Sequence, residues 1–143
     1  MNKTMILTGI LVCFLAIHAP TARAELVVIA NPHVPFNALT QGELRRIFLG
    51  QTSKLSNGEA VEPLDVSGGY RNVFYQSILM KSPEQVETYW ANMIFSGKAE
   101  PPRLIRPEEI KQAVAGSVGA ISYIDRSEVN ASVKVISIIS ESK

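Results

Sequence analysis

The stretch PLDVSGGYRNVF, residues 63–74, decides how the middle of the chain folds. It begins inside a partly apolar run, AVEPLDV, which predicts a strand over residues 60–66. Val73 and Phe74 then start an apolar pattern at helical spacing that continues to about residue 80. The two glycines between these patterns predict a tight strand-to-helix turn at residues 67–71.

This turn is a candidate anion site. The first N–H groups of a helix have no partner within the helix, and the helix dipole places partial positive charge beside them. Gly68 and Gly69 would let the backbone approach an oxyanion, while Ser67 and Arg71 would add a hydroxyl and a charged contact. With Tyr70, these residues form the predicted ligand-binding set. The open alternative is that they only make the turn, with Ser67 capping the helix and Arg71 in solvent.

Strands and helices alternate along the rest of the chain. The capping-box pattern Thr40-Gln41-Gly42-Glu43 predicts one helix, which Gly50 ends, and Ser82-Pro83-Glu84-Gln85 starts another. A further helix starts at Pro107 and ends at Gly116. The predicted strands are 25–30, 60–66, 119–124 and 132–139. This order predicts an α/β fold: a mixed, mostly parallel sheet flanked by helices, in a single domain over residues 25–143.

The first 24 residues have the pattern of a secretory signal peptide. Lys3 precedes an apolar run from Met5 to about Ile17, and Ala22-Arg23-Ala24 matches a cleavage site. We therefore predict cleavage after Ala24 and a periplasmic location for residues 25–143. No membrane insertion is expected after cleavage.

Composition then excludes several classes of function. The chain has 14 basic and 13 acidic residues, and losing Lys3 and Arg23 leaves 12 against 13, a net charge of about −1. Such a balance gives no electrostatic footprint for nucleic acid. The single cysteine, Cys13, leaves with the signal peptide, and His33 is the sole remaining histidine. Because no nucleophile has a partner base and no metal spacing is present, we predict no enzyme, no metal site and no cofactor.

Three other groups of side chains have an expected structural role. Glu62 and Asp65 on the strand 60–66 are expected to face solvent. Trp90 is expected to pack in the core, with its N–H satisfied nearby. Arg45 and Arg46 are expected to form a solvated helix face.

Pro63 predicts that the strand 60–66 lies near a sheet edge.

Four segments together resemble the phosphate-binding periplasmic proteins of ABC transporters, the PstS-like substrate-binding proteins. They are LTQGELRRIFLG, NGEAVEPLDVS, YRNVFYQSILMKSPEQVETYWANMIFSGKAEPP and VAGSVGAISYID. The specific parts are I-F-L-G at 47–50, W-x(4)-F-x-G at 90–97 and G-A-I-x-Y at 119–123. The resemblance covers nearly all of residues 25–143 and is to the second lobe and to short, single-lobe variants. It implies a periplasmic-binding-protein-like single lobe that binds phosphate or another small oxyanion, related to ABC-type phosphate transport.

The phosphate turn departs from the pattern of that family, R-x-D-G-S-G-T-R-x-x-F. Gly69 and Arg71 match, but Gly68 and Tyr70 stand where the family has serine and threonine, and Leu64 stands where it has the leading arginine. Ser67 is one position from the missing hydroxyl. A single lobe also leaves an anion hydrated, so we expect binding in the range of roughly micromolar to millimolar or weaker. The alternative is an interaction or sensory module whose former ligand edge contacts a periplasmic or membrane protein partner.

Overall fold

A five-stranded sheet organises the part of the chain that the computed structural model describes, residues 24–139. The predicted signal peptide lies in residues 1–24 and so falls, except for Ala24, outside the described residues. The strand order is β3-β2-β4-β1-β5. The strands are β1 Leu26–Ala30, β2 Glu62–Val66, β3 Arg103–Ile105, β4 Ala120–Asp125 and β5 Lys134–Ile139.

The strand directions confirm a mixed, mostly parallel sheet. β2 pairs in parallel with β3 and with β4, whereas β1 pairs antiparallel with β4 and with β5. Four strands therefore run in one direction and β1 runs against them. β1 is buried at all five positions, as expected of a strand that is paired on both sides and covered on both faces.

The sequence did not predict β3. Its three residues follow Pro101-Pro102, where the loop signal outweighs a strand too short to show periodicity. Because β3 is an edge strand, β2 and its Pro63 lie one strand inside the sheet. The Glu62 N–H donates to Gly119 of the 117–119 turn on the β4 side at 2.9 Å, so the nitrogen of Pro63 faces the β3 side. β3 starts to pair only at Leu64, so the missing donor is not needed.

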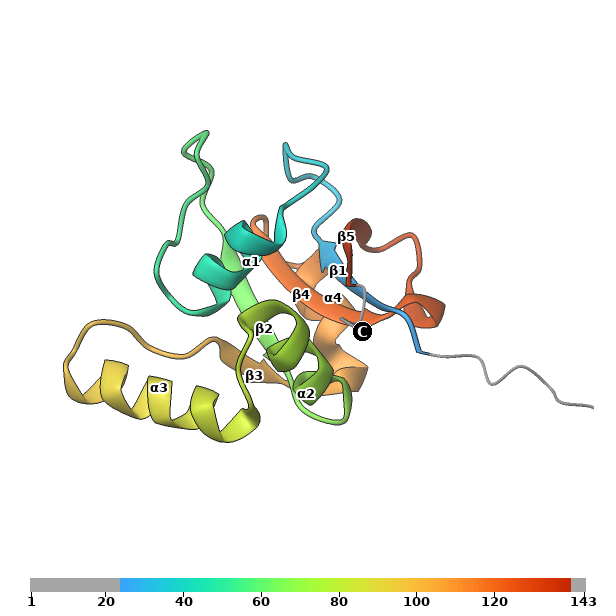
Figure 1. Ribbon diagram of the computed structural model, residues 1–143. Coiled ribbons are helices and arrows are strands. Elements are labelled where there is room, and N and C mark those ends of the chain that lie inside the picture. The colour runs from blue at the N-terminus through green and yellow to red at the C-terminus, as the bar shows by residue number, and fades with distance from the viewer. Residues whose placement is uncertain (1–23, 140–143) are drawn as a thin grey trace, which may run out of the picture.

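The helices are α1 Gln41–Phe48, α2 Tyr70–Phe74, α3 Pro83–Phe95 and α4 Ile110–Ala115. The π-helical turn η1 Tyr75–Leu79 continues α2, and the 3₁₀ turns are η2 Pro107–Glu109 and η3 Arg126–Glu128. α1 and α2 lie in front of the sheet, α4 lies behind it, and α3 extends away from the sheet beyond β3 (Figure 1). None of the helices within residues 24–139 is long and apolar enough to cross a membrane.

Both predicted capping boxes are present. The Thr40 side chain accepts from the Glu43 N–H, and the Glu43 carboxylate accepts from the Thr40 N–H at 2.8 Å. Ser82 and Gln85 repeat this arrangement at the start of α3. These local hydrogen bonds satisfy backbone donors that the first turn of a helix leaves free, which is why sequence alone located both helix starts.

A side-chain hydrogen bond connects α1 to η1. Nε of Arg45 donates to the carbonyl oxygen of Ile78 at 2.7 Å. The prediction that Arg45 is solvated is therefore wrong. Ile78 is one of the last residues of η1, whose carbonyl groups lack partners further along the helix. Met80 ends η1 by adopting a left-handed conformation, with φ 56°.

Aromatic packing beneath α2 holds the region around the turn. The rings of Phe74 and Tyr123 stack with centroids 4.0 Å apart, and Phe48 meets Phe74 edge-on at 4.7 Å. Phe74 and Tyr123 are completely buried. This packing fixes Tyr123 of β4 under Phe74, the last residue of α2, and its hydroxyl group reaches Asp65 near the end of β2.

Candidate functional site

The turn between β2 and α2 is made as predicted, but by different contacts. The Ser67 N–H donates to the carbonyl oxygen of Ile105 on β3 at 3.0 Å, and its hydroxyl donates to the same oxygen at 3.5 Å. Gly68 adopts φ +115°, a conformation that favours glycine, and the Arg71 N–H donates to its carbonyl at 3.2 Å. Ser67 therefore extends the pairing of β2 with β3. It does not cap the helix, so that part of the alternative interpretation is wrong.

The outer side of the turn is open. A Cβ atom added to Gly69 would meet nothing within 4 Å, and one added to Gly68 would meet only a Pro107 side-chain carbon, at 3.9 Å. No hydrogen bond between described residues uses the N–H of Gly68 or Gly69. Tyr70 begins α2 and is half-buried against the core. The two glycines thus leave a short stretch of backbone accessible from outside.

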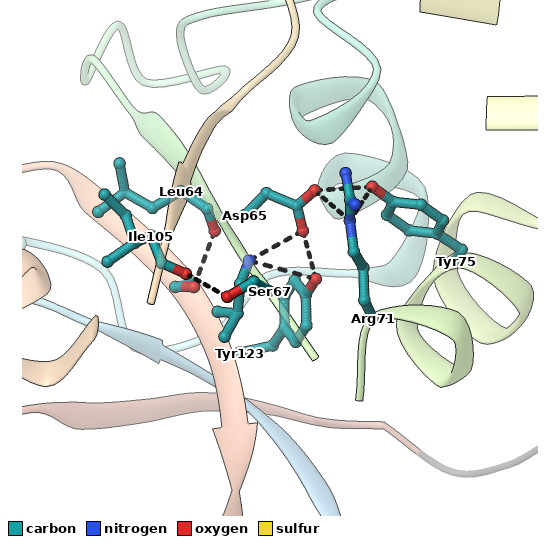
Figure 2. Close-up of polar contacts among 9 residues, drawn as sticks. Leu64, Asp65, Ser67, Arg71, Tyr75, Ile105 and Tyr123 are labelled. Carbon is teal, nitrogen blue, oxygen red and sulfur yellow. Dashed lines mark hydrogen bonds and ion pairs between the residues drawn. The ribbon is translucent and has the colours of Figure 1, made fainter. Parts of the chain in front are cut away.

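Arg71 is held on the inner side of the turn by a carboxylate and a phenol. Its Nε donates to Oδ2 of Asp65 at 2.9 Å and to the hydroxyl of Tyr75 at 2.6 Å (Figure 2). Its guanidinium carbon lies 5.1 Å from the centre of the Tyr75 ring. The Arg71 side chain keeps 39% of its surface exposed, and no hydrogen bond between residues 24–139 uses its two terminal nitrogens. The sequence predicted Arg71 but neither of its partners.

Asp65 is the centre of this network. Its Oδ1 accepts from the hydroxyl of Tyr123 and, at 2.9 Å, from the Val66 N–H, while its Oδ2 accepts from Tyr75 at 2.6 Å and from Arg71 (Figure 2). The residue is only 4% exposed. The prediction that Asp65 faces solvent is therefore wrong.

The error has a geometric reason. Glu62 and Asp65 are three positions apart on one strand, so their side chains leave opposite faces. Glu62 is exposed as predicted, and Asp65 points to the face that α2 covers. An acidic residue near the end of a strand, six positions before an arginine at a helix start, was the signal available in the sequence.

The network affects the ionisation of three of its members. Partial burial works to lower the pKa of Arg71, but the charge and hydrogen bonds of Asp65 and Tyr75 more than offset this and raise it. Burial, followed by the hydrogen bond to Asp65 and the charge of Asp65, raises the pKa of Tyr75. Burial and the Asp65 charge raise the pKa of Tyr123. Arg71 therefore stays charged, and both tyrosines stay neutral, well into the alkaline range.

These raised pKa values predict a loss of stability at high pH. A tyrosine with an ordinary pKa of about 10 ionises earlier in the unfolded chain than in the folded one. Its contribution is complete below pH ~10 and is lost as the pH rises, at up to about 1.4 kcal/mol per pH unit for each tyrosine. We expect urea midpoints of the processed protein to fall above pH ~10, and to fall less steeply in Tyr75→Phe and in Tyr123→Phe. Equal slopes in all three proteins would contradict the assignment.

A groove adjoins the exposed side of Arg71. It has a volume of ≈ 520 Å³ and lies between α2–η1 and α3. Arg71, Asn72 and Tyr75 line one wall, and α3 supplies most of the other. Trp90 is 8% exposed, which confirms its predicted packing role, yet it also lines this groove. Within residues 24–139, no cluster of acidic, histidine or cysteine side chains could hold a metal ion.

Comparisons with known proteins identify the fold. No protein-family model and no curated protein matches the chain. Among solved structures, the chain is similar to a phosphate ABC transporter substrate-binding protein with bound phosphate from Clostridium perfringens, with 20% identity and a TM-score of 0.63. It is also similar to an ABC-type phosphate transport receptor from Vibrio cholerae, with 18% identity and a TM-score of 0.62. PstS from Borrelia burgdorferi is 13% identical, with a TM-score of 0.60.

The extent of these matches is uneven. They cover 79%, 79% and 80% of this chain, but only 44%, 45% and 47% of the Clostridium, Vibrio and Borrelia proteins. The chain therefore spans less than half the length of each of them. The likeness confirms the predicted fold, that of part of a phosphate ABC transporter substrate-binding protein. The Clostridium neighbour is named as a binding protein and the Vibrio neighbour as a receptor.

Proposed function

We propose that this protein is a periplasmic binding module that takes phosphate or another small oxyanion at the turn formed by Ser67, Gly68, Gly69, Tyr70 and Arg71. The observation that carries the proposal is the state of Arg71. Its Nε is tied to Asp65 and Tyr75, so its position is set before any ligand arrives, while its terminal nitrogens have no partner among the described residues. A fixed guanidinium with two free donors suits bidentate contact with an oxyanion.

The open backbone of Gly68 and Gly69 supports the same site. Their N–H groups are in the turn that Arg71 follows, and no side chain covers them closely. The fold adds support, because one of its structural neighbours carries bound phosphate. A relation to ABC-type phosphate transport, and binding without catalysis, are part of this proposal.

The same geometry limits the affinity. Asp65 compensates the charge of Arg71, and the turn has no serine or threonine hydroxyl directed outward, because Ser67 donates to Ile105. A water-exposed anion is also screened by salt. We therefore expect a dissociation constant of roughly micromolar to millimolar, or weaker.

The test is calorimetric titration of the processed protein with phosphate and sulfate at low salt. We expect saturable phosphate binding that weakens at least about tenfold in Arg71→Ala, because a hydrogen bond to a charged group contributes about 1.5–3 kcal/mol. Arg71→Lys keeps a charge without the planar fork and should also bind more weakly. Circular dichroism of each variant shows whether it is folded.

A second basic hollow supplies the control. Arg46 and Lys54 line a hollow of ≈ 200 Å³ beside Thr52 and Ser56. Arg46→Ala should leave phosphate binding unchanged if the turn is the site. Phosphate binding that survives Arg71→Ala but not Arg46→Ala would move the site there. No heat at millimolar phosphate from the folded protein would favour the interaction module instead.

Export is the other part of the proposal. The signal pattern in residues 1–24 directs the chain to the periplasm, with cleavage after Ala24. The processed protein should therefore have Glu25 at its N-terminus, which mass spectrometry of the periplasmic fraction can measure. A chain of unprocessed mass in the cytoplasm would refute this.

A further inference from the structure

The groove beside Arg71, which we call the α3 groove, has charges of both signs. Its lining residues are Arg71, Asn72, Tyr75, Pro83, Glu84, Val86, Glu87, Trp90, Ala91, Ile94 and Pro101. Arg71 supplies the positive charge from the α2 wall, and Glu84 and Glu87 supply negative charge from the α3 wall. At ≈ 520 Å³ it is the size of a small-molecule site.

The positive end is preorganised. Asp65 and Tyr75 bind Nε of Arg71, and the guanidinium packs over the Tyr75 ring. Arg71 also lines a smaller cavity of ≈ 30 Å³, together with Asp65 and Trp90 among others. The Nε side of the guanidinium is thus occupied by Asp65 and Tyr75, and the terminal nitrogens remain for a ligand in the groove.

The negative wall does not suit a simple anion. Glu84 and Glu87 are three residues apart on α3, so they lie on the same side of the helix. Both side chains are exposed, and the helix-start contacts of Glu84, with its own backbone N–H and then with Ser82, lower its pKa and keep it ionised. Inorganic phosphate at Arg71 would gain nothing from these carboxylates and would be repelled by them.

Both walls also carry aromatic or apolar side chains. Tyr75 lines the α2–η1 wall, and Trp90 and the half-exposed Ile94 line the α3 wall. Aromatic rings beside carboxylates bind organic cations, quaternary ammonium groups above all. A ligand that complements this groove would therefore have an anionic group for Arg71, an apolar link, and a cationic group for the α3 side.

We propose that the preferred ligand is a phosphate monoester or phosphonate that carries a positively charged organic group, which binds more tightly than free phosphate. The phosphoryl group contacts Arg71, and the cationic group lies against Trp90 and the carboxylates of Glu84 and Glu87. This inference rests on the proposed oxyanion site at Arg71 and names the class of ligand that the site takes.

The experiment compares three phosphoryl probes on the processed protein at low salt. Phosphocholine carries the cation, 3,3-dimethylbutyl phosphate is its isostere with a neutral tert-butyl group in place of the cation, and inorganic phosphate lacks the substituent. We expect phosphocholine to bind about tenfold more tightly than either of the others, from one exposed charge pair and one cation–π contact. Trp90 is the single tryptophan of the chain, so its fluorescence should change when phosphocholine binds.

Two matched variants locate the cation. Glu87→Gln should reduce the preference for phosphocholine to about threefold or less, and Glu84→Gln/Glu87→Gln should abolish it, while affinity for inorganic phosphate stays equal or rises. Glu59→Gln removes an exposed carboxylate outside the groove and should change nothing. A preference that survives the double variant would overturn the proposed place of the cation.

The outcomes separate this inference from the function on which it rests. Equal affinity for phosphocholine and inorganic phosphate would overturn the inference and leave the oxyanion site intact. No binding of any of the three probes would overturn both. Phosphatidylcholine vesicles present the same groups on a lipid surface; co-sedimentation with vesicles without binding of soluble phosphocholine would assign the groove to a lipid headgroup and overturn the soluble ligand.

Discussion

Replacing Asp65 with alanine is expected to lower the free energy of unfolding by about 3–5 kcal/mol. The substitution removes the acceptor for four donors at once: the hydroxyls of Tyr75 and Tyr123, the Val66 N–H and Nε of Arg71. Tyr123 is completely buried and Tyr75 nearly so, and a buried donor without a partner costs about 1–3 kcal/mol. Arg71 adds less, because its half-exposed side chain can turn to water.

Urea denaturation of the processed protein measures this effect as a shift in midpoint at unchanged slope. Glu62→Ala on the same strand is the matched control, because Glu62 is exposed, and it should change stability by less than about 0.5 kcal/mol. In a Tyr75→Phe/Tyr123→Phe background, Asp65→Ala should cost much less, since the orphaned hydroxyls are gone. A loss below about 1 kcal/mol in the parent protein would show that the network does not stabilise the fold.

Replacing Trp90 with alanine is expected to cost about 3–5 kcal/mol of local stability and to release α3 from the rest of the protein. The Trp90 ring packs against Gly50, where an added Cβ would lie 3.0 Å from Cη2, and its neighbour Tyr89 donates to the Leu49 carbonyl at 2.6 Å. These contacts attach α3 to the end of α1. Because α3 extends beyond the sheet (Figure 1), few other contacts would keep it in place once the ring is lost.

Hydrogen exchange distinguishes local release from global unfolding. Relative to the parent protein, Trp90→Ala should accelerate the exchange of the α3 amides more than that of the β1 and β4 amides. Phe95→Ala is the control on the same helix, because Phe95 is 95% exposed and should have almost no effect. Uniformly faster exchange throughout the chain would show that α3 unfolds only with the whole domain. Release of α3 should also abolish any ligand binding in the α3 groove.

A double variant tests the contact with Gly50. Gly50 has φ +66°, so Gly50→Ala combines backbone strain with a clash against Trp90. In the Trp90→Ala background the strain and the contact of the new Cβ with Cβ of Ala99, at 3.1 Å, should remain without the clash against the ring, so Gly50→Ala should cost less there than in the parent protein.

Local sequence patterns predicted the elements around the site well. The Ser-Gly-Gly sequence located the turn, and Gly68 adopts the positive φ that such a turn requires. Two capping boxes located the starts of α1 and α3, because a cap is a hydrogen bond between residues three apart. Alternating strands and helices predicted the α/β class, since burial produces these periodicities whatever the partner.

The composition of the site could not be predicted in the same way. Tyr123 lies 58 residues from Asp65 in the chain, and their hydrogen bond exists only because β2 and β4 are neighbours in the sheet. β3, which occupies the hydroxyl and N–H of Ser67, carries no periodicity of its own. Arg71 was predicted from its place at a helix start, but only the tertiary structure decided that its Nε faces inward to Asp65 and Tyr75.

By itself, then, the sequence determined approximately where the strands other than β3, the helices and the β2–α2 turn lie, because those features depend on hydrogen bonds and burial over a few residues. The tertiary structure decided which side chains meet: Asp65 with two tyrosines, Arg45 with the last residues of η1, and Arg71 with the α3 groove. Such meetings depend on strand order and helix packing. Strand order and helix packing follow from burial of apolar surface over the whole core. No single short stretch of sequence contributes enough of that burial to predict them.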